Sequence, residues 1–137
     1  MNKSVKTETY CDIRYDKSGH ILYIKFIGDM KESEYKDVWR TGVQNAFDLG
    51  VEKIIIDQSE IGDIPFLARA WVITSLYKKI KRELSPDLAV SVLSSSNSVH
   101  KSGMQYLVKA FRKISGFAID FHPTYEESTA WLNTIRS

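Results

Sequence analysis

The sequence predicts an α/β domain whose sheet is mostly parallel. Strand-like and helix-like segments alternate along the chain, the triplet Ile54–Ile56 is apolar at every position, and a turn at Asp16–Gly19 separates two strand-like segments near the N-terminus. A strand that helices cover on both faces has no polar side, and this triplet has none. Alternating strands and helices favour parallel pairing through right-handed crossovers. With 137 residues, the chain has the length of one domain.

The first two predicted strands form a hairpin. Polar and apolar residues alternate over Tyr10–Tyr15, which is typical of a strand with one face in water. The segment His20–Ile27 is rich in β-branched and aromatic residues, which predicts a more deeply buried strand. Because the turn Asp16–Gly19 joins these segments, we expect an antiparallel strand at the N-terminal edge of the sheet. We interpret residues 1–9 as a polar tail and residues 10–137 as the single domain.

Four helices and three further strands complete the predicted order, β-β-α-β-α-β-α-β-α. The first helix follows Ser33, a favoured N-cap residue, and ends at Gly50, where a left-handed C-cap favours glycine. The triplet Ile54–Ile56 forms the next strand. The second helix begins around Pro65 and ends at Ser85–Pro86. The remaining expected elements are a strand at Leu88–Leu93, a helix at Met104–Ile114, a strand at Phe117–Phe121 and a last helix that opens at Pro123–Thr124.

The second helix has a broad apolar face. Its predicted core stripe, at helical spacing, consists of Phe66, Ala70, Ile73, Tyr77, Ile80 and Leu84, and Leu67, Trp71 and Leu76 widen it. Trp71 and Val72 lie opposite or beside this stripe, so a second surface has to cover them. That surface is either a neighbouring helix or a dimer or partner protein, and Trp is enriched at the hot spots of interfaces.

The order of elements from Tyr10 to Ile135 resembles the STAS domain and its SpoIIAA-like relatives. The segment Ile54–Ser59, with the sequence Ile-Ile-Ile-Asp-Gln-Ser, resembles the family's third strand, which ends in an Asp-x-Ser step. In the regulatory members, the second helix then starts with a serine that a partner kinase phosphorylates. Here Pro65–Ala68 stands at that place and has no serine or threonine, so the resemblance does not carry the phosphorylation site over. It implies a small α/β domain that binds a protein or a small ligand and catalyses no reaction.

The segment after the buried strand is the first candidate binding site. Loops at the carboxyl ends of parallel strands face the crevice where open α/β sheets bind ligands. Asp57, Ser59, Glu60 and Asp63 lie within seven residues. Their oxygens either hold a cation or the basic face of a partner, or they cap the loop and face water. The acidic residues lack the spacing of a calcium loop, so we expect no metal site there.

The polar loop after the next strand is the second candidate. It contains Ser95, Ser96, Asn97 and His100 and leads into a helix. Hydroxyls and backbone N–H groups at a helix N-terminus bind phosphate or carboxylate. Alternatively, the serines cap the helix and form turns. No glycine-rich run ending in Gly-Lys-Ser/Thr is present, which excludes a P-loop.

Charge is distributed unevenly along the chain. The net charge is +2, but residues 1–68 carry nine basic and twelve acidic side chains, whereas residues 69–137 carry ten and five. The basic excess lies in the second and third helices, mainly in Lys78, Lys79, Lys81, Arg82, Lys109, Arg112 and Lys113. These residues either attract an anionic partner such as nucleic acid or acidic lipid, or form solvated helix faces that keep the domain soluble.

The sequence contains no catalytic motif. Three scattered His and one Cys provide neither a metal-ligand spacing nor a disulfide, and the polar start has no signal-peptide core. We therefore expect a cytoplasmic, non-enzymatic STAS-like regulatory module without a cofactor. It would bind a protein partner or a small ligand, or form a homodimer, through residues 57–63 and the second helix, including Trp71. The alternative function is binding to nucleic acid or acidic lipid through the basic second and third helices.

Overall fold

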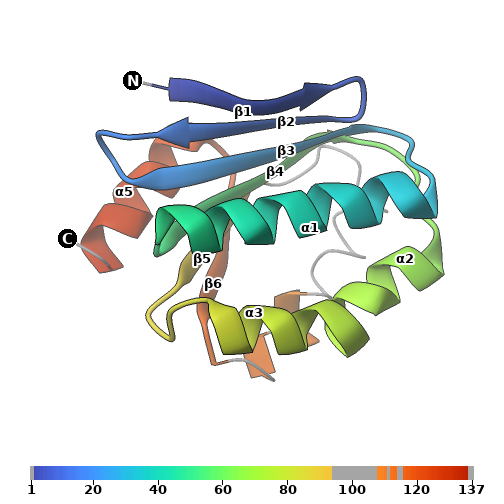
Figure 1. Cartoon of the computed structure of the whole chain (residues 1–137). Helices are drawn as coiled ribbons and strands as arrows, with labels where there is room; N and C mark the ends of the chain where they lie inside the picture. The colour runs from blue at the N-terminus through green and yellow to red at the C-terminus, as the bar shows by residue number, and fades with distance from the viewer. Residues whose placement is uncertain (1, 94–107, 111, 114–115, 136–137) are drawn as a thin grey trace.

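The computed structural model describes residues 2–93, 108–110, 112–113 and 116–135. These residues contain one six-stranded sheet whose strands lie in chain order (Figure 1). The pairs β1–β2 and β2–β3 are antiparallel. The pairs β3–β4, β4–β5 and β5–β6 are parallel, which confirms the predicted mixed α/β sheet. The strands are β1 (Asn2–Glu8), β2 (Cys11–Asp16), β3 (Ile21–Gly28), β4 (Lys53–Ile61), β5 (Ala89–Leu93) and β6 (Ala118–His122).

Helices cover both faces of the sheet. The helix α1 (Glu32–Leu49) and the continuous second helix lie on one face, and α5 (Tyr125–Ile135) lies on the other (Figure 1). The second helix consists of α2 (Phe66–Trp71), the π turn η1 (Val72–Leu76) and α3 (Tyr77–Glu83). Residues 108–110 and 112–113 are also helical. Within the described ranges, no helix is long and apolar enough to cross a membrane.

The triplet Ile54–Ile56 lies in the middle of the sheet, as predicted. It pairs in parallel with β3 on one side and with β5 on the other. Ile54 and Ile56 are buried against α1 and the second helix, whereas Ile55 is buried against α5. Because side chains alternate between the two faces of a strand, a fully apolar triplet needs cover on both faces, and this sheet has it.

Residues 2–8 correct the prediction of a polar tail at residues 1–9. They form β1, an edge strand antiparallel to β2. Lys6 anchors this strand because its ammonium lies 2.6 Å from the Asp37 carboxylate of α1, and the Tyr10 hydroxyl donates to the same carboxylate at 2.9 Å. Few apolar residues are needed at such an edge, and charged side chains there oppose pairing with further strands. The strand predicted at Tyr10–Tyr15, observed as β2, is therefore the second strand rather than the edge.

The start of α1 also differs from the prediction. Lys31, not Ser33, is the N-cap residue, and Ser33 is exposed within the first turn. The Lys31 backbone N–H donates to the Glu34 carboxylate at 2.9 Å, which satisfies one of the free donors at the helix start. Gly50 is the C-cap with φ 65°, as predicted from its lack of a side chain.

The π turn changes which side chains of the second helix face the core. The buried residues are Ala68, Val72, Leu76, Ile80 and Leu84, each four positions after the last. A strict four-residue spacing drifts around an α-helix of 3.6 residues per turn, and a π turn takes up the surplus residue. The predicted stripe is correct at Ile80 and Leu84 but wrong at Phe66, whose side chain is 78% exposed.

Candidate functional site

The carboxyl end of β4 holds the first predicted site. Asp57 is only 5% exposed, and its carboxylate accepts hydrogen bonds from the Tyr23 hydroxyl on β3 and, at 2.8 Å, from the Ser59 backbone N–H. Burial, reinforced by the hydrogen bond to Asp57, raises the pKa of the Tyr23 hydroxyl far above its usual value. Tyr23 is therefore a stable donor, and Asp57 fixes the backbone that follows it.

The next residues continue β4 instead of forming the expected loop. Glu60 lies opposite Ile27 of β3, just after a register shift between the two strands. Its carboxylate forms an ion pair with the Lys25 ammonium, and the hydrogen bond within this pair raises the pKa of Lys25. The backbone N–H of Asp63 donates to the Asp29 carboxylate at 2.6 Å. The Asp57 carboxylate is thus buried and hydrogen-bonded, whereas the Glu60 carboxylate is paired with Lys25. No group of three His, Cys, Asp or Glu side chains in the described part of the chain could hold a metal ion.

Gln58 is a buried polar residue beside this segment. Its side chain is 1% exposed, and neither its amide nitrogen nor its amide oxygen has a hydrogen-bond partner among the described residues. A buried polar group without a partner costs stability. No sequence pattern identified Gln58 as buried. The apolar run that predicts burial ends at Ile56, whereas the observed strand continues through the polar residues that follow.

The exposed start of α2 was missed by the sequence prediction. Phe66 and Leu67 are 78% and 71% exposed, and they directly follow the β4 segment through Ile64 and Pro65. Among the described residues, Phe47 and Leu49, at the end of α1, are the other exposed large apolar side chains, with 50% and 36% exposure. Adjacent exposed apolar side chains beside a polar segment are typical of protein interaction sites.

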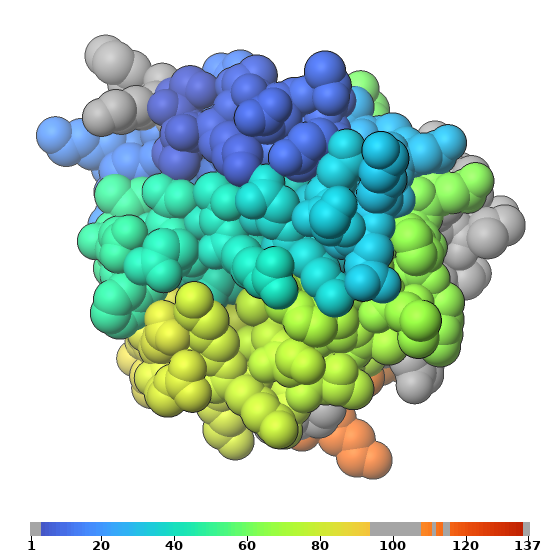
Figure 2. All heavy atoms as spheres, turned by 45° about the vertical axis from the view of Figure 1, so that its right-hand side comes forward, coloured from blue at the N-terminus to red at the C-terminus, as the bar shows by residue number. Residues whose placement is uncertain are grey.

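Trp71 lies in a groove between α1 and the second helix. The Lys36 ammonium and the Arg40 guanidinium of α1 lie over its ring, at 5.4 and 5.0 Å from the ring centre. Of the two predicted covers for this half-buried Trp, the structure therefore shows the neighbouring helix. Figure 2 shows α1 as a cyan to green band above the yellow-green second helix, and the groove, of about 450 Å³, lies between them.

A Ser–His contact lies on the opposite face of the sheet. The Ser91 Oγ lies 2.6 Å from His122 Nδ1 and 2.7 Å from the Ser128 Oγ, and both serines are 0% exposed. The Trp131 ring packs on His122 with 4.9 Å between ring centres. A nucleophilic serine has to reach its substrate, and the Ser91 hydroxyl is enclosed. Its hydrogen bond to Ser128 instead connects α5 to the sheet.

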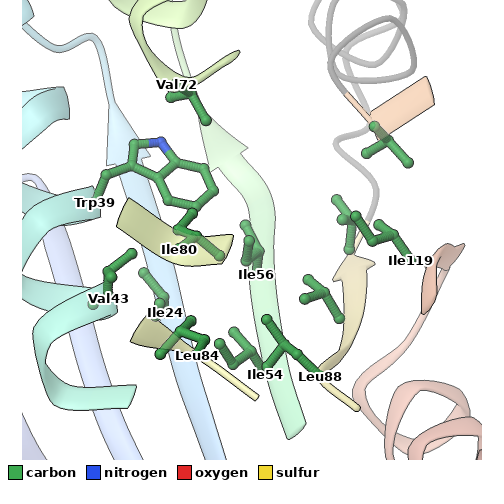
Figure 3. Close-up of a pocket in the computed structure, with 14 residues that line it drawn as sticks. Ile24, Trp39, Val43, Ile54, Ile56, Val72, Ile80, Leu84, Leu88 and Ile119 are labelled. Atoms are coloured by element: carbon green, nitrogen blue, oxygen red, sulfur yellow. The ribbon is translucent and has the colours of Figure 1, made fainter. Parts of the chain in front are cut away.

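An apolar cavity of about 60 Å³ lies between the sheet and the helices α1 and α3 (Figure 3). Figure 3 shows Trp39, Val43, Ile56 and Ile80 around it, and all fourteen lining residues are apolar. An engineered apolar cavity that binds benzene has a volume of about 150 Å³. This cavity is smaller, so it is a gap in core packing in the structure described.

The second predicted loop lies outside the described residues. The roles of Ser95, Ser96, Asn97 and His100 in anion binding or in capping the helix therefore remain predictions.

Comparison with known proteins supports the architecture. No family model matches the sequence, and no curated protein matches it. Among solved structures, an uncharacterized protein of the DUF3478 family from Shewanella loihica PV-4, described with a SpoIIAA-like fold, superposes with a TM-score of 0.60. The match covers 96% of this chain and 95% of that chain, at 16% sequence identity. The fold is SpoIIAA-like.

The SpoIIAA-like fold confirms the family resemblance that the element order predicted. At 16% identity, the likeness concerns the fold alone, because one fold hosts many functions. Function therefore has to be argued from the side chains that this SpoIIAA-like domain presents. Those at the end of β4, the start of α2 and the groove beside Trp71 are the candidates.

Proposed function

We propose that this SpoIIAA-like domain is a non-enzymatic interaction module that binds a partner protein through the start of α2 and the adjoining residues 57–63. The observation that carries the proposal is the exposure of Phe66 and Leu67, 78% and 71%, at two consecutive positions. Burying two such side chains at an interface contributes about 1.5–3 kcal/mol each. A few residues near the centre of an interface usually account for most of its binding energy.

The surroundings of the apolar pair support the same role. Ser59, Glu60 and Asp63 are exposed and belong to the segment that leads into α2. Interfaces commonly combine an apolar centre with such a polar rim. The acidic side chains of this rim favour a partner with basic residues at the edge of its binding surface.

The backbone beneath this surface is fixed before any partner arrives. Asp57 holds the N–H of Ser59, and the Gly62 N–H donates to the Gly28 carbonyl at 2.8 Å. The Met30 N–H donates to the Asp63 carbonyl at 3.1 Å. A segment ordered in the free protein loses less conformational entropy on binding, which favours recognition. The enclosure of Ser91 also supports a role without catalysis.

The proposal is tested with the double variant Phe66→Ser/Leu67→Ser. Cross-linking at position 63 in cells, followed by quantitative mass spectrometry, identifies partners of the wild-type chain. We expect the double variant to lower the recovery of a specific partner by about tenfold or more, since a hot-spot residue contributes at least about 2 kcal/mol.

Phe47→Ser is the matched control, because Phe47 is 50% exposed at the far end of α1. Thermal unfolding of all variants checks that the fold is retained. Equal recovery of every partner by the double variant, or loss with Phe47→Ser alone, would refute the assignment of this surface.

A second candidate function is binding to an anionic surface. Lys78, Lys81 and Arg82 of α3 are exposed, as are Lys109 and Lys113. Val108 lines the same cavity as Ile80 of α3, so these basic segments are neighbours. Retention on DNA, RNA or anionic vesicles that weakens steeply with added salt is the expected result. Lack of retention on all three at low salt would eliminate this function.

A further inference from the structure

Basic side chains line the groove between α1 and the second helix. Two of its lining residues are basic, Arg40 and Lys79, and none is acidic. Neither Arg40 nor Lys79 forms an ion pair with a carboxylate in the part of the chain that the structure describes, whereas Lys36 nearby pairs with Glu32 at 3.1 Å. The lining consists of Arg40, Thr41, Gln44, Asn45, Trp71, Ser75, Leu76 and Lys79.

Trp71 orients the Arg40 side chain. The guanidinium carbon lies 5.0 Å from the centre of the indole ring, within the range of a cation–π contact. A cation–π contact leaves N–H groups at the edge of the guanidinium able to donate hydrogen bonds to a ligand. A planar fork of donors that is already held in place matches two oxygens of a phosphate group with little further loss of entropy.

The π turn forms the other wall of the groove. Ser75 and Leu76 belong to η1, and Trp71 directly precedes it. Leu76 is 3% exposed and also belongs to the core, so the wall is anchored. π turns are rare and are frequently found at functional sites. This turn places a hydroxyl, an apolar side chain and an indole on one wall, opposite Arg40 and Thr41 of α1.

We propose that this groove binds a small organic phosphate. The Arg40 guanidinium and the Lys79 ammonium bind the phosphate oxygens, and the hydroxyls of Thr41 and Ser75 donate further hydrogen bonds. The organic part lies beside the portion of the Trp71 ring that Lys36 and Arg40 leave uncovered. The groove volume, about 450 Å³, falls within the range of about 300–1,000 Å³ that is usual for small-molecule sites. The site is separate from the surface proposed for the protein partner, so either proposal can fail alone.

The test follows the indole N–H signal of Trp71 by NMR during titration of the full chain. The probes are inorganic phosphate, adenosine monophosphate and adenosine, and Trp71→Phe assigns the signal. We expect a saturable shift with the monophosphate, weaker binding of inorganic phosphate and no binding of adenosine. Absence of a saturable shift with both phosphates would overturn the proposal. Equal affinity for inorganic phosphate and adenosine monophosphate would overturn the claim that the groove also binds the organic part of the ligand.

Substitutions locate the binding within the groove. Arg40→Gln and Lys79→Gln are each expected to weaken binding of the monophosphate by about tenfold or more, the effect of losing a charge-assisted hydrogen bond. Arg40→Lys keeps the charge but loses the fork, so its affinity should lie between those of wild type and Arg40→Gln. Lys78→Gln is the matched control, since Lys78 is exposed but does not line the groove. Equal losses from Lys78→Gln and Lys79→Gln would overturn the site in favour of diffuse attraction.

Discussion

The hydroxyl of Tyr23 on β3 donates a hydrogen bond to the buried carboxylate of Asp57 on β4, and so links the two central parallel strands. Asp57 is one of the four residues that the sequence predicted as a binding site after the buried strand. Its observed partners make it a structural support for the surface beside it. Its two carboxylate oxygens, which we considered among the cation ligands, accept hydrogen bonds from a phenol and a backbone N–H.

Tyr23→Phe is expected to destabilise the domain by about 1–3 kcal/mol, because it leaves a buried carboxylate acceptor without its donor. Urea unfolding measures the change. Tyr15→Phe is the control, since Tyr15 also loses a hydroxyl contact, to His20 at 2.6 Å, but at an exposed site. Equal effects of the two variants would contradict the special weight given to the Asp57 contact.

Asp37 predicts a loss of stability in acid. The hydrogen bond from Lys6 lowers the pKa of the Asp37 carboxyl below 3.8, its ordinary value. Because the folded-state pKa is the lower one, this stabilisation is complete above the unfolded-state value and is lost as the pH falls through the folded-state pKa. The side chain of Asp37 is 42% exposed, so solvent screening limits the effect to about 1 kcal/mol or less.

Asp37→Asn therefore should lower stability near pH 7 and flatten its pH dependence below about pH 4. Urea unfolding at several pH values measures both effects. Asp48→Asn serves as the comparison, because Asp48 is exposed and accepts a hydrogen bond from the uncharged Gln44 amide at 2.9 Å. An unchanged slope in Asp37→Asn would show that the Lys6 contact does not persist in solution.

Gln58→Met is expected to stabilise the protein by about 1–3 kcal/mol, since it replaces an unpartnered buried amide by an apolar side chain of similar size. Thermal and urea unfolding measure the gain. Gln44→Met, at an exposed position of α1, should change stability little. A clear loss of stability in Gln58→Met would mean that the amide is hydrogen-bonded in solution.

Val90→Ile should stabilise the domain by up to about 0.8 kcal/mol by adding a methylene group to the apolar cavity that Val90 lines. Val51→Ile is the control, because Val51 is 2% exposed and does not line the cavity. The added methylene group has no free space there, so overpacking should destabilise the domain. Calorimetry of both variants measures the contrast. Destabilisation by both would indicate that the cavity collapses in solution.

The sequence was informative wherever hydrophobic periodicity matched the real geometry. Ile54–Ile56 predicted the central strand because burial on both faces leaves a simple pattern. Residues 2–8 were missed, since a polar edge strand gains its stability from β2 and from the Lys6–Asp37 contact, which lies far away in sequence. The segment 57–61 was expected to be a loop because its polar residues hide a continuation of β4.

The candidate site was only partly predictable. Asp57, Ser59 and Asp63 lie where expected, but their partners Tyr23 and Asp29 come from β3 and the residues after it, and pairing of distant residues has no local signature. The alternation of side chains along β3 and β4 could have placed Tyr23 and Asp57 on the same face. The exposure of Phe66 could not be predicted, because helical periodicity assumes an unbroken α-helix.

The extra residue held in η1 has a geometric consequence for the whole second helix. It turns the half before Val72 by about 100° relative to the half after Leu76, compared with a regular helix. If the same residues formed a regular α-helix, Phe66 and Ile73 would lie in line with Ile80 above the sheet. The surplus residue, accommodated in the π turn, keeps Ala68 inside and displays Phe66. Deleting one residue from η1 would therefore restore a regular helix while leaving the same side chains inside and outside.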